Sequence, residues 1–284
     1  MDIPEADQAL VDMAVELATA AGALTRKWFD RGTVQFDTKD DGSPVTEADK
    51  AAERYLREQI SLAFPTDAIV GEEEDDRDGT SGRTWIIDPI DGTKSFTHGV
   101  PLYGTLLSVV DEHGPAVGVI VMPALEEVVS AGRGLGARHN GRETSVNEHD
   151  DFESSYIMTS GFEYWPDPTE RDRLVNCSAT VRTWADAYGY VLLATGRSEA
   201  VVDPLVKIWD IAPMQVIIPE AGGVLTDQVG APWEEGRHIV ASNGKVHNRV
   251  INAVFGEGPI EDFEPDEGDE LADDGHGEPE LESE

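Results

Sequence analysis

The stretch Trp85-Ile86-Ile87-Asp88-Pro89-Ile90-Asp91-Gly92-Thr93-Lys94-Ser95-Phe96 decides the fold, because an apolar run carries two aspartates onto a tight turn that opens toward a helix. We expect Asp88 to end a strand and Asp91 to begin the next element. Both carboxylates would then converge on hard divalent cations, which favour oxygen ligands. The residues alone fit a plain turn equally well, since Asp, Pro and Gly are common turn residues.

Backbone groups of the same turn add to this interpretation. Ile90, between the two aspartates, can offer its carbonyl oxygen as a further ligand. Gly92 and Thr93 would present N–H groups at a helix N-terminus, where unsatisfied donors and the helix dipole suit a phosphate oxygen. Cations and N–H donors would therefore face one phosphoryl group.

Two more segments supply carboxylates. Val70-Gly71-Glu72-Glu73-Glu74 follows another apolar stretch, and Ile208-Trp209-Asp210-Ile211-Ala212-Pro213 starts a predicted long apolar helix that ends at Glu220-Ala221-Gly222-Gly223. With these motifs the chain resembles the inositol monophosphatase family of magnesium-dependent phosphomonoesterases, whose signatures are a G-E-E turn, D-P-I-D-G-T and W-D-x-A with a trailing E-A-G-G. The resemblance runs from about Leu10 to about Phe255.

The resemblance implies a site with two to three Mg²⁺ ions. Glu72, Asp88 and the Ile90 carbonyl would bind the first ion, and Asp88, Asp91 and Asp210 would bind the second. A third, weaker ion would rest on Glu72, and Glu72 is counted among the catalytic residues together with Asp49 and Thr93. Asp88 would bridge the first two ions, so we expect it to be the least replaceable residue.

The family also uses a Thr–Asp pair to orient the attacking water, and the matching residues here are Thr93 and Asp49. Without the resemblance, Asp49 would be interpreted as the capping partner of Thr46 at the start of a helix. Lys39 corresponds to a family lysine near the metal loop, although this loop is about one residue shorter here. Glu73 would support the metal ligands from behind.

Substrate choice depends on a later segment, Asp186-Ala187-Tyr188-Gly189-Tyr190, followed by A-T-G-R-x-E-x-x-x-D-P. Both are similar to the histidinol-phosphatase branch of the family, and Asp203 matches the family's acidic substrate contact. Asp186 and Asp203 would suit a cationic alcohol phosphate through charge-assisted hydrogen bonds. Asp186 also fits a plain helix N-cap.

Histidinol-phosphate phosphatase is therefore the favoured function. Inositol-1-phosphate phosphatase and a broader sugar phosphatase stay open, with fructose-bisphosphate and 3′-phosphoadenosine phosphatases more distant. A non-catalytic binding protein of the same fold is the alternative from another class. It predicts a missing metal ligand, whereas every matched ligand stands here.

Composition narrows the partners. The 284 residues include 57 acidic and 21 basic ones, and the net charge of −36 opposes binding to nucleic acid or to an anionic membrane surface. The single Cys177 excludes an internal disulfide, and no signal peptide or membrane-spanning run is visible. We expect a cytoplasmic enzyme, and the resemblance suggests a homodimer.

The pattern of elements predicts an α+β layered sandwich of helices and sheets, the inositol monophosphatase-like fold. We expect an N-terminal α+β lobe (1–147) with an antiparallel sheet and most metal ligands, and an α/β lobe (148–256) with Asp210 and the substrate pocket. The stretch 257–284 carries fourteen acidic residues and no Lys or Arg. It is expected to be a disordered acidic tail.

Helical spacing predicts helices over 6–29 and after Thr46, and Asn140-Gly141 predicts a hairpin turn. Further strands are expected at 102–110, 116–122, 127–130, 155–160, 181–184 and 200–203.

Overall fold

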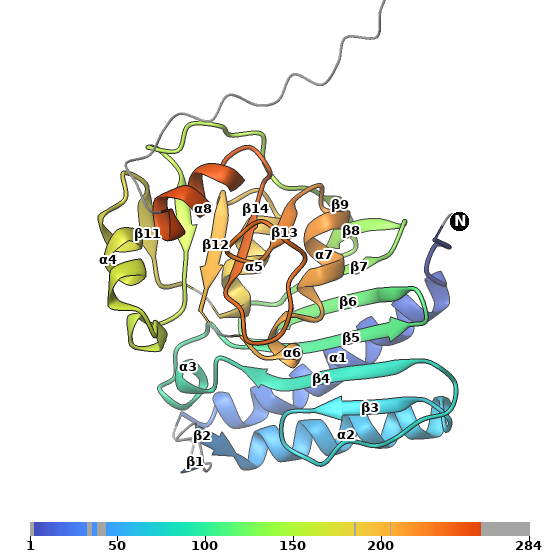
Figure 1. Cartoon of the computed structure of the whole chain (residues 1–284). Helices are drawn as coiled ribbons and strands as arrows, with labels where there is room; N and C mark the ends of the chain where they lie inside the picture. The colour runs from blue at the N-terminus through green and yellow to red at the C-terminus, as the bar shows by residue number, and fades with distance from the viewer. Residues whose placement is uncertain (1–2, 33–35, 39–43, 185, 205, 257–284) are drawn as a thin grey trace, which may run out of the picture.

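The computed structural model describes residues 3–32, 36–38, 44–184, 186–204 and 206–256 (Figure 1). Lys39 and the acidic segment 257–284 lie outside the described residues. Within the described ranges the chain forms a seven-stranded sheet, a five-stranded sheet and a short antiparallel pair, β1 (Phe36–Thr38) with β2 (Pro44–Thr46).

The seven-stranded sheet is antiparallel except at one edge, where β3 runs parallel to β4. Its strands follow the chain order: β3 (Ala68–Gly71), β4 (Thr84–Asp91), β5 (Gly104–Asp111), β6 (Gly114–Met122), β7 (Glu127–Gly132), β8 (Gly136–His139) and β9 (Arg142–Thr144). The Asn140-Gly141 hairpin turn between β8 and β9 is confirmed.

The five-stranded sheet is mixed, with parallel pairing on both sides of β10 and antiparallel pairing beyond β12. Its spatial order is β11 (Thr180–Arg182), β10 (Tyr156–Met158), β12 (Ala200–Asp203), β14 (Ile239–Ser242) and β13 (Val224–Thr226). The helical segments of the chain are α1 (Gln8–Phe29), α2 (Glu47–Ala63), α3 (Thr93–Thr97), η1 (Phe162–Tyr164), α4 (Pro168–Asn176), α5 (Ala187–Ala194), α6 (Ile208–Ile211), α7 (Met214–Glu220) and α8 (His247–Phe255).

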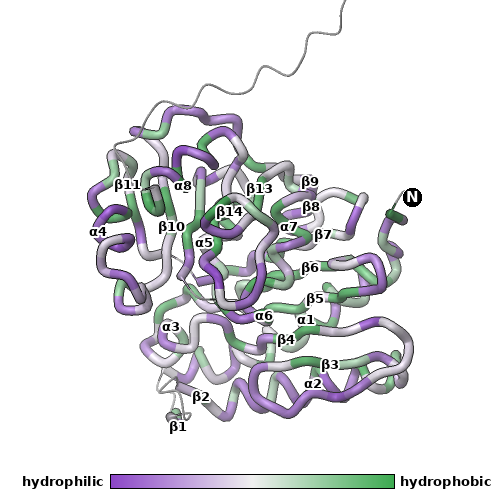
Figure 2. Tube along the Cα trace, in the orientation of Figure 1, coloured by the Kyte–Doolittle hydropathy of each residue, from purple (hydrophilic) through white to green (hydrophobic). Residues whose placement is uncertain are grey.

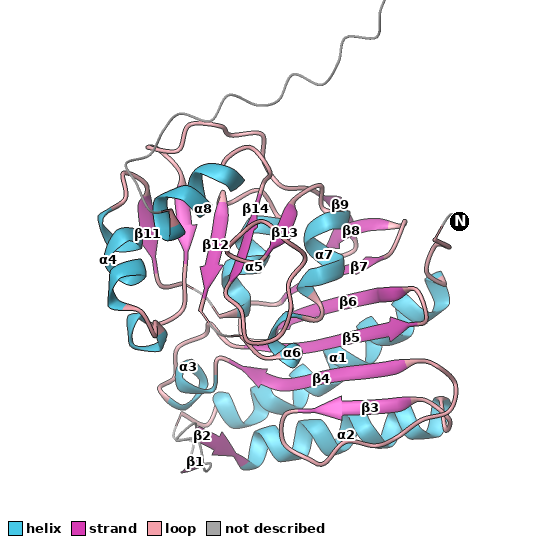
Figure 3. Ribbon diagram, in the orientation of Figure 1, coloured by secondary structure: helices cyan, strands magenta, loops and turns pink. Residues whose placement is uncertain are grey.

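Helices and sheets alternate in layers (Figures 1 and 3). Helices α1 and α2 cover one face of the seven-stranded sheet, and α5 and α7 lie between the two sheets. Helices α4 and α8 cover the far side of the five-stranded sheet. Each layer boundary buries its own hydrophobic cluster, and the layered sandwich expected from the sequence is confirmed.

Local sequence explains why these elements form where they do. Asp7 caps α1 by accepting a hydrogen bond from the Ala9 N–H, and apolar residues at helical spacing face the sheet. Thr46 and Asp49 form the predicted capping box of α2. Figure 2 shows the central strands β5 and β6 largely hydrophobic, because helices cover both faces of this sheet.

Two local predictions were wrong. The apolar helix expected from Asp210 to Glu220 is two short helices, because Pro213 has no N–H to continue the hydrogen-bond ladder. Asp91 does not begin a new element, since β4 continues through both aspartates and its pairing with β5 shifts register between Asp88 and Asp91. This bulge, rather than a turn, sets the direction of the second carboxylate.

In the described part of the chain no helix is both long and apolar enough to cross a bilayer.

Candidate active site

Three aspartates from two segments far apart in the sequence lie close together. Asp88 and Asp91 stand on β4 and Asp210 stands on α6, and one carboxylate oxygen of each lies within 4.8 Å of the others. Each is fixed by a backbone N–H: Ile90 donates to Asp88 at 3.0 Å, Ala187 to Asp91 at 2.5 Å, and Lys207 to Asp210 at 2.8 Å. These contacts hold like charges together before any counter-ion binds.

The pKa values report this crowding. Burial, followed by the charges of Glu72 and Asp91, raises the pKa of Asp88 well above its usual range. Burial and the neighbouring Asp186 do the same for Asp91. Burial, then the carboxylates of Glu72 and Asp186, raises the pKa of Asp210 to about 7. The cluster therefore resists full ionisation unless positive charge enters it.

Glu72 lines the same small cavity, of about 160 Å³, as the three aspartates and Ile90 of the β4 bulge. Its loop is shaped by Glu53, a buried residue of α2 that accepts hydrogen bonds from the Glu73 N–H at 2.9 Å and the Glu74 N–H at 3.1 Å. A Cβ at Gly71 would come within 2.2 Å of the Glu53 carboxylate. The G-E-E turn therefore needs its glycine for the close approach of a supporting carboxylate.

Of the Thr–Asp pair expected to hold water, Thr93 lines this cavity and Asp49 does not, and each has another hydrogen-bond partner. The Thr93 hydroxyl donates to the Ile90 carbonyl at 3.0 Å, and one oxygen of Asp49 accepts from Thr46. The second oxygen, Asp49 Oδ1, is buried and has no hydrogen-bond partner among the residues that the structure describes. Burial raises the pKa of Asp49 to about 6. A partnerless buried oxygen in an all-oxygen donor set fits a site that takes a cation and its water.

The helix expected after the two aspartates is present as α3 but is short. Gly92 adopts a left-handed conformation with φ of 78° and precedes α3, which has five residues. A Cβ at Gly92 would lie 3.2 Å from the Asp186 carboxylate. The glycine thus allows Asp186, from the second sheet's half of the chain, to approach the metal loop closely.

A second cavity, of about 350 Å³, opens beside the aspartates. Asp203 lies on its wall, accepting from the Ser160 N–H at 2.8 Å and from the Tyr190 hydroxyl at 3.0 Å. Burial, then the charge of Asp186, raises the pKa of Asp203 to about 6. Asp186 lines both cavities, and burial raises its pKa as well.

Asp186 occupies the N-cap position of α5, yet its side chain makes no capping hydrogen bond. The carboxylate that would cap a helix instead faces the two cavities. The plain helix N-cap explains where Asp186 lies in the chain. It does not explain why the side chain faces the cavities.

Sequence reasoning missed several supporting groups. Glu53 gave a weak signal as a lone acidic residue on the apolar face of α2, one turn after Asp49. Tyr190 stood within a motif of interest without a role, although it hydrogen-bonds Asp203. The backbone N–H of Ala187, which holds Asp91, carries no signal in its residue type.

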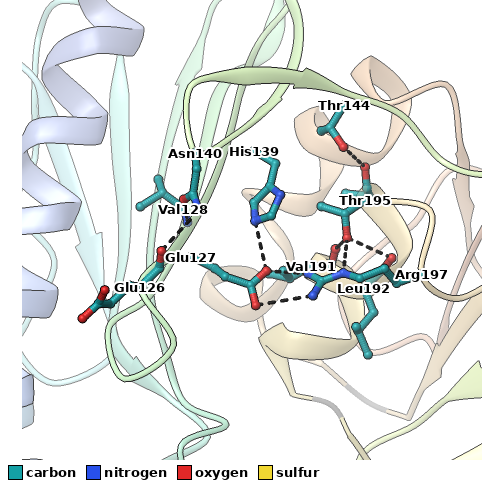
Figure 4. A network of polar contacts seen from close by, with 11 residues as sticks. Glu126, Glu127, Val128, His139, Asn140, Thr144, Val191, Leu192, Thr195 and Arg197 are labelled. Atoms are coloured by element: carbon teal, nitrogen blue, oxygen red, sulfur yellow. Dashed lines mark hydrogen bonds and ion pairs between the residues drawn. The ribbon is translucent and has the colours of Figure 1, made fainter.

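The far end of α5 is anchored to the first sheet (Figure 4). The Arg197 guanidinium lies 2.5 Å from Glu127 at the start of β7, and His139 Nε2 of β8 lies 3.0 Å from the same carboxylate. Arg197 also donates to the Thr195 hydroxyl at 2.8 Å, and Thr144 donates to the Ala194 carbonyl at 3.2 Å. The helix that delivers Asp186 is therefore fixed at both ends.

The layered fold, the acidic cluster and the adjoining cavity together fit a hydrolase of phosphate esters, and comparison with known proteins agrees. The sequence model of the inositol monophosphatase family matches residues 6–257. The chain belongs to this family and is a phosphoric monoester hydrolase.

Within this family, the chain is similar to proteins of known activity. A histidinol-phosphatase of Chlorobaculum parvum is 41% identical over 248 residues, which cover 86% of this chain and 96% of the relative. A histidinol-phosphatase of Mycobacterium tuberculosis is 36% identical over 250 residues, or 85% and 96% of the two chains. The structure of an IMPase from Thermotoga maritima superposes with a TM-score of 0.79 at 29% identity, covering 87% and 97%.

Proposed function

We propose that this chain hydrolyses histidinol phosphate with Mg²⁺. The observation that carries the proposal is the pair of carboxylates, the half-buried Asp186 and the buried Asp203, that line the cavity beside the acidic cluster. Histidinol phosphate carries an ammonium group and an imidazole, both of which gain charge-assisted hydrogen bonds from carboxylates. The two histidinol-phosphatases at 41% and 36% identity support the same substrate.

Glu72, Asp88, Asp91, Asp210 and the Ile90 carbonyl are the proposed ligands for two to three Mg²⁺ ions. Bound there, the ions would neutralise the phosphoryl group, lower the pKa of an attacking water and stabilise the departing oxygen. The chain's own part is to hold five oxygens around one small cavity. Glu53 keeps the Glu72 loop in place.

Proton handling and phosphate binding fall to other groups. Asp49, through its partnerless oxygen, and Thr93 are proposed to orient the attacking water. The N–H groups of Gly92 and Thr93 are proposed to bind a phosphate oxygen. Glu73 supports the ligand loop through its N–H bond to Glu53.

The remaining assignments extend the proposal to the whole protein. Residues 1–147 would form the lobe with most metal ligands, and 148–256 the lobe with Asp210 and the substrate pocket. The enzyme is proposed to be cytoplasmic, and its net charge of −36 opposes binding to nucleic acid and to anionic membranes. The family supports a homodimer.

The test is phosphate release with Mg²⁺ from histidinol phosphate and from inositol 1-phosphate, measured side by side at low and high KCl. We expect kcat/KM to favour histidinol phosphate. Comparable or reversed values would make the chain an inositol-type or general phosphatase, and no release from any ester would revive the non-catalytic alternative.

Asp186→Ala sharpens this test. Loss of a hydrogen bond to a charged group costs about 10- to 100-fold, and we expect that loss in kcat/KM for histidinol phosphate but a smaller one for inositol 1-phosphate. Asp186→Asn, which keeps the shape and removes the charge, should fall between Ala and wild type. Equal losses with both esters would contradict the cation pocket.

A further inference from the structure

The two cavities of the site meet at a narrow set of residues. One cavity surrounds the acidic cluster, and the other lies against Asp203. Four residues line both cavities: Asp91, Asp186, Asp210 and Tyr164. Consider a phosphate ester whose phosphoryl group lies at the cluster and whose alcohol part fills the larger cavity. Such an ester must lie beside these four residues. Three are carboxylates, and Tyr164 is the aromatic member.

The Tyr164 ring contacts a residue of a different segment of the site, Lys94. It stands in η1, after the first strand of the five-stranded sheet, whereas Lys94 belongs to α3, directly after the metal loop. The Lys94 ammonium lies 4.3 Å from the Tyr164 ring centroid and 3.3 Å from the Glu163 carboxylate. These two contacts join the ring to the segment that carries Asp88 and Asp91.

The chain on either side of Tyr164 is also fixed. The next residue, Trp165, is buried, donates to the Thr159 hydroxyl at 3.3 Å and stacks on His238. On the other side the Ser160 N–H donates to Asp203. The Tyr164 side chain nevertheless stays 44% exposed. A well-anchored segment therefore presents an accessible ring at the junction of the two cavities.

We propose that Tyr164 is a specificity-determining residue whose ring packs against the flat, cationic alcohol part of the substrate, with Lys94 and Glu163 as positioning residues. The inference rests on the proposed function, because the ring offers a cation–π and stacking surface that an imidazole and an ammonium can use. Inositol has neither group. Carboxylates and ring would together select a cationic aromatic alcohol.

The test compares Tyr164→Ala and Tyr164→Phe with a control from the same turn, Phe162→Ala. Phe162 is 39% exposed, close to Tyr164, and lines neither cavity. Steady-state kinetics would use histidinol phosphate and inositol 1-phosphate, with thermal unfolding to verify the fold of each variant.

For Tyr164→Ala we expect the ratio of kcat/KM between histidinol phosphate and inositol 1-phosphate to fall about fivefold to tenfold, mainly through KM, as the usual strength of such ring contacts implies. Tyr164→Phe should keep the wild-type ratio, because the ring supplies the contact. Phe162→Ala should match wild type with both esters. Lys94→Met should lower the ratio part of the way, and Lys94→Arg should restore it.

An unchanged ratio in Tyr164→Ala would overturn the inference, as would a fall in Phe162→Ala of the same size. Failure of the proposed function gives a different result. In that case the wild-type enzyme itself shows no preference for histidinol phosphate, whatever the variants do.

Discussion

Helix α5 joins two regions of opposite electrostatic character. At its first turn, Asp186 and the Ala187 N–H lie among buried carboxylates whose pKa values are all raised. Beyond its last turn, Arg197 and His139 both lie against the Glu127 carboxylate, so the charge of Arg197 is paired with an opposite charge (Figure 4). One end gathers like charges, and the other pairs unlike ones.

The comparison shows where the fold is complete by itself and where it depends on something bound. The network at Arg197 needs no ligand to satisfy its charges. The cluster at Asp88 contributes repulsion until positive charge enters, since burial weakens the screening of the carboxylates by water. The site thus contains unfavourable repulsion between carboxylates. Contacts at the opposite end of α5 help to hold the helix in place against that repulsion.

The largest expected effect comes from breaking the like-charge end at its centre. Asp88→Asn should lower kcat by about 10³-fold or more, because a proposed bridging ligand supplies several kcal/mol of transition-state stabilisation. Without divalent ions the variant should unfold at the same or a higher temperature than wild type, since one buried charge is gone. Kinetics and thermal unfolding in EDTA measure the two effects.

Asp67→Asn is the matched control. Asp67 is as buried as Asp88, yet it is paired with Arg83 at 2.7 Å and with the Trp85 indole N–H at 2.9 Å. Removing its charge should lower stability and leave kcat near wild type. If Asp88→Asn behaved like Asp67→Asn, losing stability while keeping turnover, the metal assignment would be wrong.

The contrast between the two ends also marks what a sequence can predict. The acidic end of the comparison could be predicted from sequence, because Asp88, Asp91 and Asp210 lie in short motifs with characteristic spacing. The paired end does not, since Glu127 and Arg197 are 70 residues apart and neither stands in a distinctive pattern. Only the packing of β7 against the segment after α5 brings them together.

Errors within the motifs have local causes. The aspartates of β4 were expected on a turn, but pairing with β5 continues past Asp88 after a register shift. Such a bulge depends on the partner strand, which spacing along one strand does not reveal. Pro213 gave a signal for the break before α7, because it has no N–H for a helical hydrogen bond, although Pro219 lies inside α7. The layered fold was predictable because its helical and strand periods are strong.

A second, intermediate effect tests whether bound ions relieve the crowding. Folding raises the pKa of Asp49 and Asp203 to about 6 and of Asp210 to about 7, above the usual value near 3.8. Because these groups bind protons more tightly in the folded state, their contribution to the free energy of unfolding is greatest below about pH 4. This contribution is lost as the pH rises through about 6 to 7. In EDTA, therefore, the melting temperature should fall between about pH 5 and pH 8.

Mg²⁺ should reverse this fall, since it binds the ionised carboxylates. The rise in melting temperature on adding Mg²⁺ should be several degrees larger at about pH 8 than at about pH 5. KCl at equal ionic strength is the control for general screening of the net charge of −36. An equal rise at both pH values, or the same rise with KCl, would show that the cluster is not where the ions act.

The smallest expected effect comes from breaking the paired end. Arg197→Met should lower the free energy of unfolding by about 1 kcal/mol, because the Arg197 side chain is 38% exposed and water screens the pair. Arg171→Met is the control: Arg171 is 37% exposed and pairs only with the neighbouring, solvent-facing Asp172 in the described structure, so its loss should be nearer zero. Urea unfolding measures both variants, and a double-mutant cycle with Glu127→Gln isolates the coupling.

Kinetics of the Arg197 variant decide whether the two ends of α5 act separately. The N-terminal end has its own attachments, the Ala187 N–H to Asp91 and the Tyr190 hydroxyl to Asp203. If these suffice, Arg197→Met keeps the wild-type ratio of kcat/KM between histidinol phosphate and inositol 1-phosphate despite its lower stability. A changed ratio would mean that the network positions Asp186 through the length of the helix, and the paired end would then belong to substrate selection as well as to stability.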